Sequence, residues 1–188
     1  MAKIRYGLSN CYYSLLTVNS SGVETYATPV NLPGAVALTL ESAGETVDEF
    51  ADNITWYHQD TNNGYTGTFE CEVLGDDFRK TILGEVEDNN GVLWEASNVD
   101  TKEFALLGQF EIGGDSTDTG KRFAFMRCVV GRPANNGSTK EATITPQHDT
   151  LNITAMPRIS DHLVKATCYS SDTAAYSAWF NAVPVKSS

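Results

Sequence analysis

The residues of this chain that are best suited to chemistry are paired carboxylates. Glu70 and Glu72 lie two positions apart in a segment with the alternating pattern of a β-strand, residues 67–74. Alternate residues of a strand point to the same face, which would place these two side chains roughly 7 Å apart. Inverting glycosidases hold two carboxyl groups at about 6.5–9.5 Å. Such an enzyme also needs an aromatic-lined cleft, which the sequence does not place, so we do not expect an enzyme.

The three histidines, His58, His148 and His162, show no metal-binding spacing, because no HxxxH or HExxH pattern occurs. Residues 88–91 (DNNG) resemble the start of a calcium loop but have no distal glutamate in register. No P-loop, GxGxxG or GxSxG motif is present. The sequence therefore predicts no catalytic residue, no metal and no cofactor.

The four cysteines are widely spaced. No CxxC pair occurs, so neither a zinc knuckle nor a redox pair is supported. The chain begins without an apolar leader segment, so we expect reduced thiols, buried as small hydrophobic side chains, and folding in a cytosol. The cysteines are Cys11, Cys71, Cys128 and Cys168.

Acidic residues are concentrated in the first part of the chain. The formal net charge is −11, and residues 1–100 hold 16 acidic and 4 basic residues. This excess is either an ordinary solvated face or a surface that repels an anion. A basic face that wraps nucleic acid is excluded by composition. No apolar run of 18 residues occurs, so we expect no membrane partner.

Strand patterns dominate the chain. In residues 67–74, Phe69, Cys71 and Val73 alternate with polar residues and should face a core, while Glu70 and Glu72 face the other way. Residues 45–50 and 54–59 read as a hairpin around Asp52 and Asn53. The other segments with strand-like patterns are residues 12–18, 23–26, 36–40, 104–112, 122–130, 143–145, 151–154 and 163–169.

Two segments favour helices. Residues 76–83 place Phe78, Ile82 and Leu83 on one face, and Gly84 follows as a typical helix end. Residues 173–183 form a possible C-terminal helix.

Together, the strand and helix patterns predict one domain over residues 1–188, mainly β, with two packed antiparallel sheets in a β-sandwich and one flanking helix. Residues 1–7 and 183–188 are expected to be arms that order only on assembly.

Ten segments, spread in order over nearly the whole chain, resemble the major tail protein of long-tailed, non-contractile bacteriophages. They are NLPGA (31–35), ADNI (51–54), NGYTG (63–67), DDF (76–78), ILG (82–84), NGVL (90–93), KEFAL (102–106), GSTKE (137–141), TAMP (154–157) and WFNAV (179–183). Each is weakly specific alone, and their order carries the resemblance.

This resemblance implies a structural virion protein with the phage tail-tube fold, not an enzyme. Such proteins form hexameric rings that stack head to tail into the tail tube, and their strands line a lumen through which DNA passes during ejection. The implied partners are further copies of the chain, a tape-measure protein inside the tube, and tail terminator and distal tail proteins at its ends. The implied location is the virion tail, assembled in the cytoplasm of the host bacterium.

Two surfaces are expected to serve this role. Glu70 and Glu72 should face the lumen, where an acidic wall would let DNA slide without binding. Residues 41–64 should form a hairpin that packs on the adjacent ring, with Trp56 or Tyr57 as an anchor. The alternative is an ordinary hairpin over its own core. The acidic residues expected in this contact are Glu45, Asp48, Glu49 and Asp52.

A second function class fits the same β-rich sequence. An immunoglobulin-like binding or decoration module of a virion would also be non-enzymatic, but it would be a monomer or small oligomer with aromatic residues clustered in its loops. A hydrolase would instead need a pocket that joins two carboxylates with perturbed pKa values. The oligomeric state of the purified protein separates the first class from the second.

Overall fold

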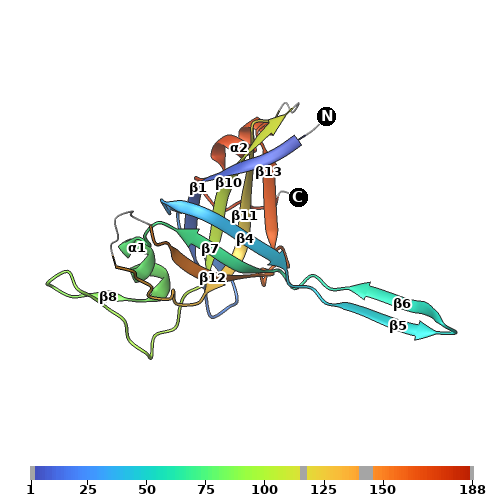
Figure 1. Ribbon diagram of the computed structural model, residues 1–188, viewed down its shortest axis with the longest axis horizontal. Coiled ribbons are helices and arrows are strands. Elements are labelled where there is room, and N and C mark those ends of the chain that lie inside the picture. The colour runs from blue at the N-terminus through green and yellow to red at the C-terminus, as the bar shows by residue number, and fades with distance from the viewer. Residues whose placement is uncertain (1–2, 115–117, 140–145, 187–188) are drawn as a thin grey trace.

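Most of the chain belongs to one large antiparallel sheet (Figure 1). A computed structural model of the protein describes residues 3–114, 118–139 and 146–186. Within these residues the sheet has nine strands: β1 (Lys3–Val18), β2 (Glu24–Tyr26), β3 (Val30–Asn31), β4 (Ala35–Ser42), β7 (Tyr65–Cys71), β10 (Phe104–Gly114), β11 (Gly120–Val130), β12 (Asp149–Met156) and β13 (Lys165–Tyr169). The prediction of a mainly β, sandwich-like fold is confirmed. The strand expected over residues 143–145 lies outside the described residues.

Strand β11 is shared between two layers of this sheet. One edge of β11 pairs with β10 along its length. On the other edge, residues 121–125 pair with β13 and residues 127–130 pair with β12. The sheet therefore forks, and β12, β7 and β4 cross over the layer formed by β1, β10 and β11 (Figure 1). The two layers of the sandwich are thus parts of one hydrogen-bonded sheet.

The larger core lies between these layers. Phe69 of β7, Leu106 of β10 and Leu151 of β12 are fully buried in it. Their burial follows from the period-two alternation of each strand, which turns every second side chain inward. Neighbouring polar residues such as Thr68 and Asn152 point to the opposite face of the second layer.

The predicted helix is present directly after β7. It consists of α1 (Asp76–Phe78) and a π-helical turn, η1 (Arg79–Leu83). Phe78, Ile82 and Leu83 are all buried in the larger core, and the Phe78 ring contacts those of Tyr13 and Phe104 edge-on. Gly84 ends the helix with a φ of 75°, a left-handed conformation that glycine adopts without strain.

A second, smaller core lies on the other face of the first layer. Leu107 and Met126 point into it, and the C-terminal segment covers it. Helix α2 (Thr173–Ala178) is shorter than the expected residues 173–183, because Trp179 turns in against the sheet and donates its indole N–H to the Phe123 carbonyl at 3.2 Å. Val183, expected to begin a C-terminal arm, is buried in this core.

The N-terminal residues also differ from the expected arm. Residues 3–7 are part of β1 and pair with the end of β10, from Lys3 opposite Gly114 to Tyr6 opposite Glu111. A register shift follows at Gly7, whose φ is 58°. This first part of β1 has its own backbone partner, so it is a strand end rather than a free segment.

The expected burial of Val73 is wrong. Strand β7 ends at Cys71, and Val73 is 75% exposed. The backbone N–H of Leu74 donates to Asp149 at 2.8 Å, and Leu74 rather than Val73 is buried. The chain bends after Cys71, so the alternation that holds through Phe69 and Cys71 does not continue.

Replacing Phe69 by alanine tests this register. Removing a fully buried ring should lower the free energy of unfolding by about 3–5 kcal/mol. The matched control Val73→Ala alters a side chain that is already in solvent and should change it by less than about 0.5 kcal/mol. Urea unfolding followed by tryptophan fluorescence measures both. Equal losses in the two variants would contradict a strand end at Cys71.

Candidate functional site

A long hairpin projects from the body of the protein (Figure 1). Its strands are β5 (Thr46–Ala51) and β6 (Ile54–Asp60), which pair with each other in a separate two-stranded sheet. Asp52 and Asn53 form the turn with φ values of 50° and 61°. Positive φ at both central residues is the requirement of a type I′ turn, which asparagine and aspartate tolerate. The predicted hairpin and its turn are therefore present.

Every residue of both hairpin strands is exposed. Phe50 is 72% exposed and Trp56 69% exposed, and Val47, Ile54 and Tyr57 are also among the exposed large hydrophobic residues. An ordinary hairpin over its own core, the alternative considered from sequence, is therefore wrong. Large apolar side chains gathered on one projecting element mark an interaction surface.

The hairpin continues the ladder between two strands of the second layer. Ser42 at the end of β4 lies opposite Tyr65 at the start of β7, and the N–H of Ala43 donates to Gly64. The joint is crowded: a Cβ on Gly64 would lie 1.9 Å from the Ala155 carbonyl oxygen, and one on Gly44 would lie 1.8 Å from that of Thr61. The direction of the hairpin is thus set by close backbone packing at its base.

The hairpin is strongly acidic. Residues 43–64 contain five acidic residues and no lysine or arginine. His58 lies between two of them, with Nδ1 at 2.5 Å from Asp48 Oδ1 and Nε2 at 3.6 Å from Asp60 Oδ2. The hydrogen bond to Asp48 and the charges of both carboxylates raise the pKa of His58. Thr46 donates to Asp60 and, with His58, lowers the pKa of that carboxyl group.

A second surface is the outer face of β4, β7 and β12. Its side chains alternate with the buried ones, and they are uncharged or acidic. Pairing brings them together in rows, with Thr39, Thr68 and Asn152 in adjacent positions. Lysine and arginine are absent from this set. The set is Thr39, Glu41, Thr66, Thr68, Glu70, Thr150, Asn152 and Thr154, which we call the threonine face.

The two glutamates singled out in the sequence are not a pair on one strand. Glu70 lies on β7, half-buried on the threonine face, with Thr150 and Ala37 as its neighbours across the ladders. Glu72 lies beyond the end of β7, is exposed, and has Oε2 at 3.8 Å from His148 Nε2. The bend after Cys71 separates their environments, so the strand spacing that suggested a glycosidase does not apply.

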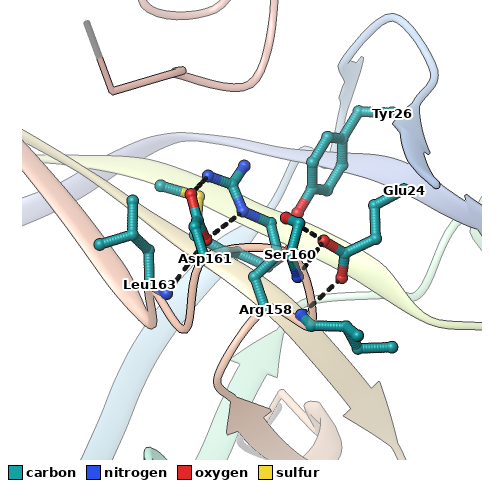
Figure 2. A network of polar contacts seen from close by, with 8 residues as sticks. Glu24, Tyr26, Arg158, Ser160, Asp161 and Leu163 are labelled. Carbon is teal, nitrogen blue, oxygen red and sulfur yellow. Dashed lines mark hydrogen bonds and ion pairs between the residues drawn. The ribbon is translucent and has the colours of Figure 1, made fainter. Parts of the chain in front are cut away.

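The polar network drawn in Figure 2 ties a loop to the sheet. The Arg158 side chain is almost fully buried and donates twice to Asp161. Glu24 on β2 accepts from the backbone N–H groups of Ile159 and Ser160, at 2.8 and 3.1 Å, and from the Ser160 hydroxyl. Tyr26 donates to the Met126 carbonyl. These groups satisfy one another and fasten the turn between β12 and β13, which indicates a structural role.

The described part of the chain gives no sign of a reactive centre. No group of three or more His, Cys, Asp or Glu side chains in it is placed to hold a metal ion. All four cysteines are free and buried, and burial raises the pKa of Cys11 to about 12 and that of Cys71 to about 11. A thiol with such a pKa is protonated at neutral pH and a poor nucleophile. None of the helices in these residues is long and apolar enough to cross a membrane.

Comparison with models of known protein families gave no match, and a search of curated proteins gave none either.

Sequence reasoning found the hairpin and its residues Glu45, Asp48, Glu49, Asp52, Trp56 and Tyr57. It did not single out Val47, Phe50 and Ile54, which are exposed beside them. It also missed a pocket lined by Arg5, Lys121 and Lys165, described below. No local signal marks that pocket, because its residues come from separate strands. The hairpin, by contrast, is one continuous segment.

The His58 arrangement gives a pH-dependent prediction. The pKa of His58 is raised above 6.5, the value of an unperturbed histidine. The ion pairs of His58 with Asp48 and Asp60 therefore contribute fully to hairpin stability below about pH 6.5, and this contribution is lost as the pH rises through the raised pKa of the folded hairpin. Titration of the His58 ring followed by NMR should give a pKa above 6.5. Asp48→Asn should lower it clearly, and the control Asp52→Asn, in the turn, should lower it much less. Equal effects of the two variants would contradict the Asp48–His58 contact.

Proposed function

We propose that this chain is a self-assembling structural protein, the subunit of a bacteriophage tail tube. One observation carries the proposal: a long hairpin with exposed aromatic and acidic residues projects from a well-packed β body and buries none of its strands against that body. In the proposed role, hexameric rings of the chain stack head to tail, and the hairpin contacts the adjacent ring.

The hairpin has the composition of an interface anchor. Tryptophan and tyrosine are enriched among the residues that dominate the binding energy of protein contacts, and phenylalanine is enriched in interfaces generally. Trp56, Tyr57 and Phe50 are exposed on the free subunit, so their burial on a partner would remove apolar surface from water. The surrounding carboxylates keep this surface soluble and disfavour unspecific edge pairing until a partner is present.

The threonine face supports the second half of the proposal, an acidic-lined conduit for DNA. Affinity for duplex DNA comes mainly from lysine and arginine contacts to phosphates. The threonine face offers none, and Glu41 and Glu70 add negative charge to it. Among the described strands, β4 is the last in the order of this sheet, so in the proposed ring a strand of a neighbouring subunit could pair with it.

The other partners follow from the same proposal. A tape-measure protein would occupy the tube before DNA does, and terminator and distal tail proteins would bind its two ends. The protein would then reside in the virion tail after assembly in the bacterial cytoplasm. These partners rest on the sequence resemblance and on the assembly surface together.

Assembly of the purified, concentrated protein tests the proposal. Electron microscopy should show rings or tubes with a channel of roughly 20 Å or more, the width of duplex DNA. Trp56→Ala should abolish or strongly reduce them while leaving the thermal midpoint of the body unchanged, because that side chain packs on none of the core. The matched control is Trp94→Ala, since Trp94 is 60% exposed but lies outside the hairpin, on β9 (Leu93–Trp94).

A protein that stays monomeric at every concentration, also when seeded with tail tips, would contradict a tube subunit. That result would favour the virion binding or decoration module. Equal loss of assembly in Trp56→Ala and Trp94→Ala would show that the hairpin is not the specific contact.

The threonine face gives a separate prediction. Tubes of Glu41→Lys with Glu70→Lys should retain duplex DNA at low salt and release it as salt rises, because the lumen would then carry phosphate-binding charges. Wild-type tubes should not retain DNA. The control Asp100→Lys adds a positive charge in an exposed loop away from this face. Filter retention of labelled DNA measures all three, and equal retention by the control would contradict a lumenal threonine face.

A further inference from the structure

A pocket lies between the first layer and strands β4 and β7 of the second layer. Its volume is about 130 Å³. Its floor is aromatic and aliphatic, formed by Phe110 of β10, Phe123 and Phe125 of β11, Tyr65 of β7, and Leu38 and Leu40 of β4. A cavity of about 150 Å³ is large enough to admit a benzene ring. The pocket is slightly smaller than that cavity but is open to solvent, so an aromatic side chain can enter it in part.

Three basic side chains line this pocket, which we call the cationic pocket. The Arg5 guanidinium lies 4.7 Å from the Phe110 ring centroid. The Lys165 ammonium lies 4.5 Å from that of Tyr65 and also donates to its hydroxyl at 2.9 Å. Lys121 lies 5.3 Å from the ring of Tyr169. Among the described residues, none of these three cations forms an ion pair with a carboxylate.

This concentration of positive charge is unusual for the chain. The protein has 13 basic residues against 24 acidic ones. Outside the pocket, Arg79, Lys80, Arg127, Arg132 and Arg158 pair with carboxylates, and Arg122 rests on the Tyr176 and Phe180 rings. In the cationic pocket, the cations rest on aromatic rings instead, so their charge remains available to an incoming anion. The site thus fits a ligand with an aromatic ring flanked by carboxylates.

The hairpin has the matching chemistry. It presents Phe50 and Trp56 in solvent among five acidic residues, without a single lysine or arginine. Opposite charge across a contact steers association and fixes its register. A cation beside a buried aromatic ring adds attraction that grows when water is excluded. The carboxylates and the exposed aromatic rings therefore both make the hairpin a suitable occupant of the cationic pocket.

The hairpin of one chain does not reach the pocket of that same chain. Leu40 and Tyr65, which line the pocket, lie at the base of the hairpin, next to Ser42 and Gly64. The six residues of β5 carry the turn about 20 Å away from this base. Figure 1 shows the hairpin directed away from the body. The occupant must therefore come from another copy.

We infer that the cationic pocket receives the tip of the acidic hairpin from a second copy of this chain. This inference rests on the proposed self-assembly and names the surface that the hairpin binds. In the proposed stack this contact is heterologous: each copy donates its hairpin to one neighbour and accepts a hairpin from another, instead of exchanging hairpins within a two-fold pair. Repetition of such a contact produces a polar assembly, as a head-to-tail stack requires.

Charge exchange between the two surfaces tests the contact on the full-length protein. The hairpin variant is Glu49→Lys with Asp52→Lys, which changes carboxylates at or beside the turn, and the pocket variant is Lys121→Glu with Lys165→Glu. Each alone should weaken self-association by about tenfold or more, because like charges then face each other. An equimolar mixture should recover wild-type association, since the reversed hairpin fits the reversed pocket and the unchanged hairpin of one variant fits the unchanged pocket of the other.

The matched control for net charge is Lys102→Glu with Lys186→Glu, which changes two exposed lysines outside the pocket. It should leave association unchanged. Sedimentation velocity at constant ionic strength measures association, and circular dichroism checks folding. If a charge-reversed variant does not fold, the neutral substitutions Glu49→Gln and Lys165→Gln replace it, with a smaller loss expected in each.

The outcomes separate this inference from the proposed function. If the hairpin variant and the pocket variant both associate as strongly as the wild type, the pocket contact is overturned and the proposed self-assembly still stands. The direct contact is also overturned if both variants lose self-association and their mixture does not recover it. It is overturned as well if the control loses as much self-association as the variants. A wild-type protein that stays monomeric at every concentration overturns both.

Discussion

The fork at β11 is the constraint on which the rest of this structure depends. β12 and β13 share one edge of β11, and from this point β12 carries β7 and β4 across the first layer (Figure 1). That crossing creates the larger core, which Phe69 and Leu151 fill. It also brings β4 and β7 over Phe110 and Phe123, and the cationic pocket lies between them.

The same ladder connects the structural and the proposed functional parts of the molecule. Strands β4 and β7 contribute inward residues to the core, outward residues to the threonine face, and their joined ends to the base of the hairpin. The three surfaces are therefore fixed relative to one another by one pair of strands. A subunit that must contact a neighbour and also line a channel benefits from this arrangement, because both surfaces are held by the same hydrogen-bonded ladder.

Local patterns in the sequence predicted much of this fold. The rest was not predictable, because it depends on pairing between residues far apart in the sequence. The alternation through Phe69 and Cys71, the turn at Asp52 and Asn53, and the burial of Phe78 and Ile82 all follow from residues close in sequence. Val73 was wrongly placed, because the bend after Cys71 depends on a hydrogen bond from Leu74 to Asp149. The cationic pocket was not predictable, since register alone brings Lys121 opposite Phe110 and Lys165 opposite Phe125.

The complete exposure of the hairpin has a thermodynamic consequence. An isolated two-stranded hairpin is marginally stable at best in water, because it has no core of its own. Its cross-strand pairs, such as Thr46 with Asp60, lie in solvent and add little stability. The free energy needed to open the hairpin is thus far below that needed to unfold the sheet. Heat or denaturant should therefore open the hairpin before the sheet, and in the proposed assembly a neighbouring subunit would supply the burial that the free subunit lacks.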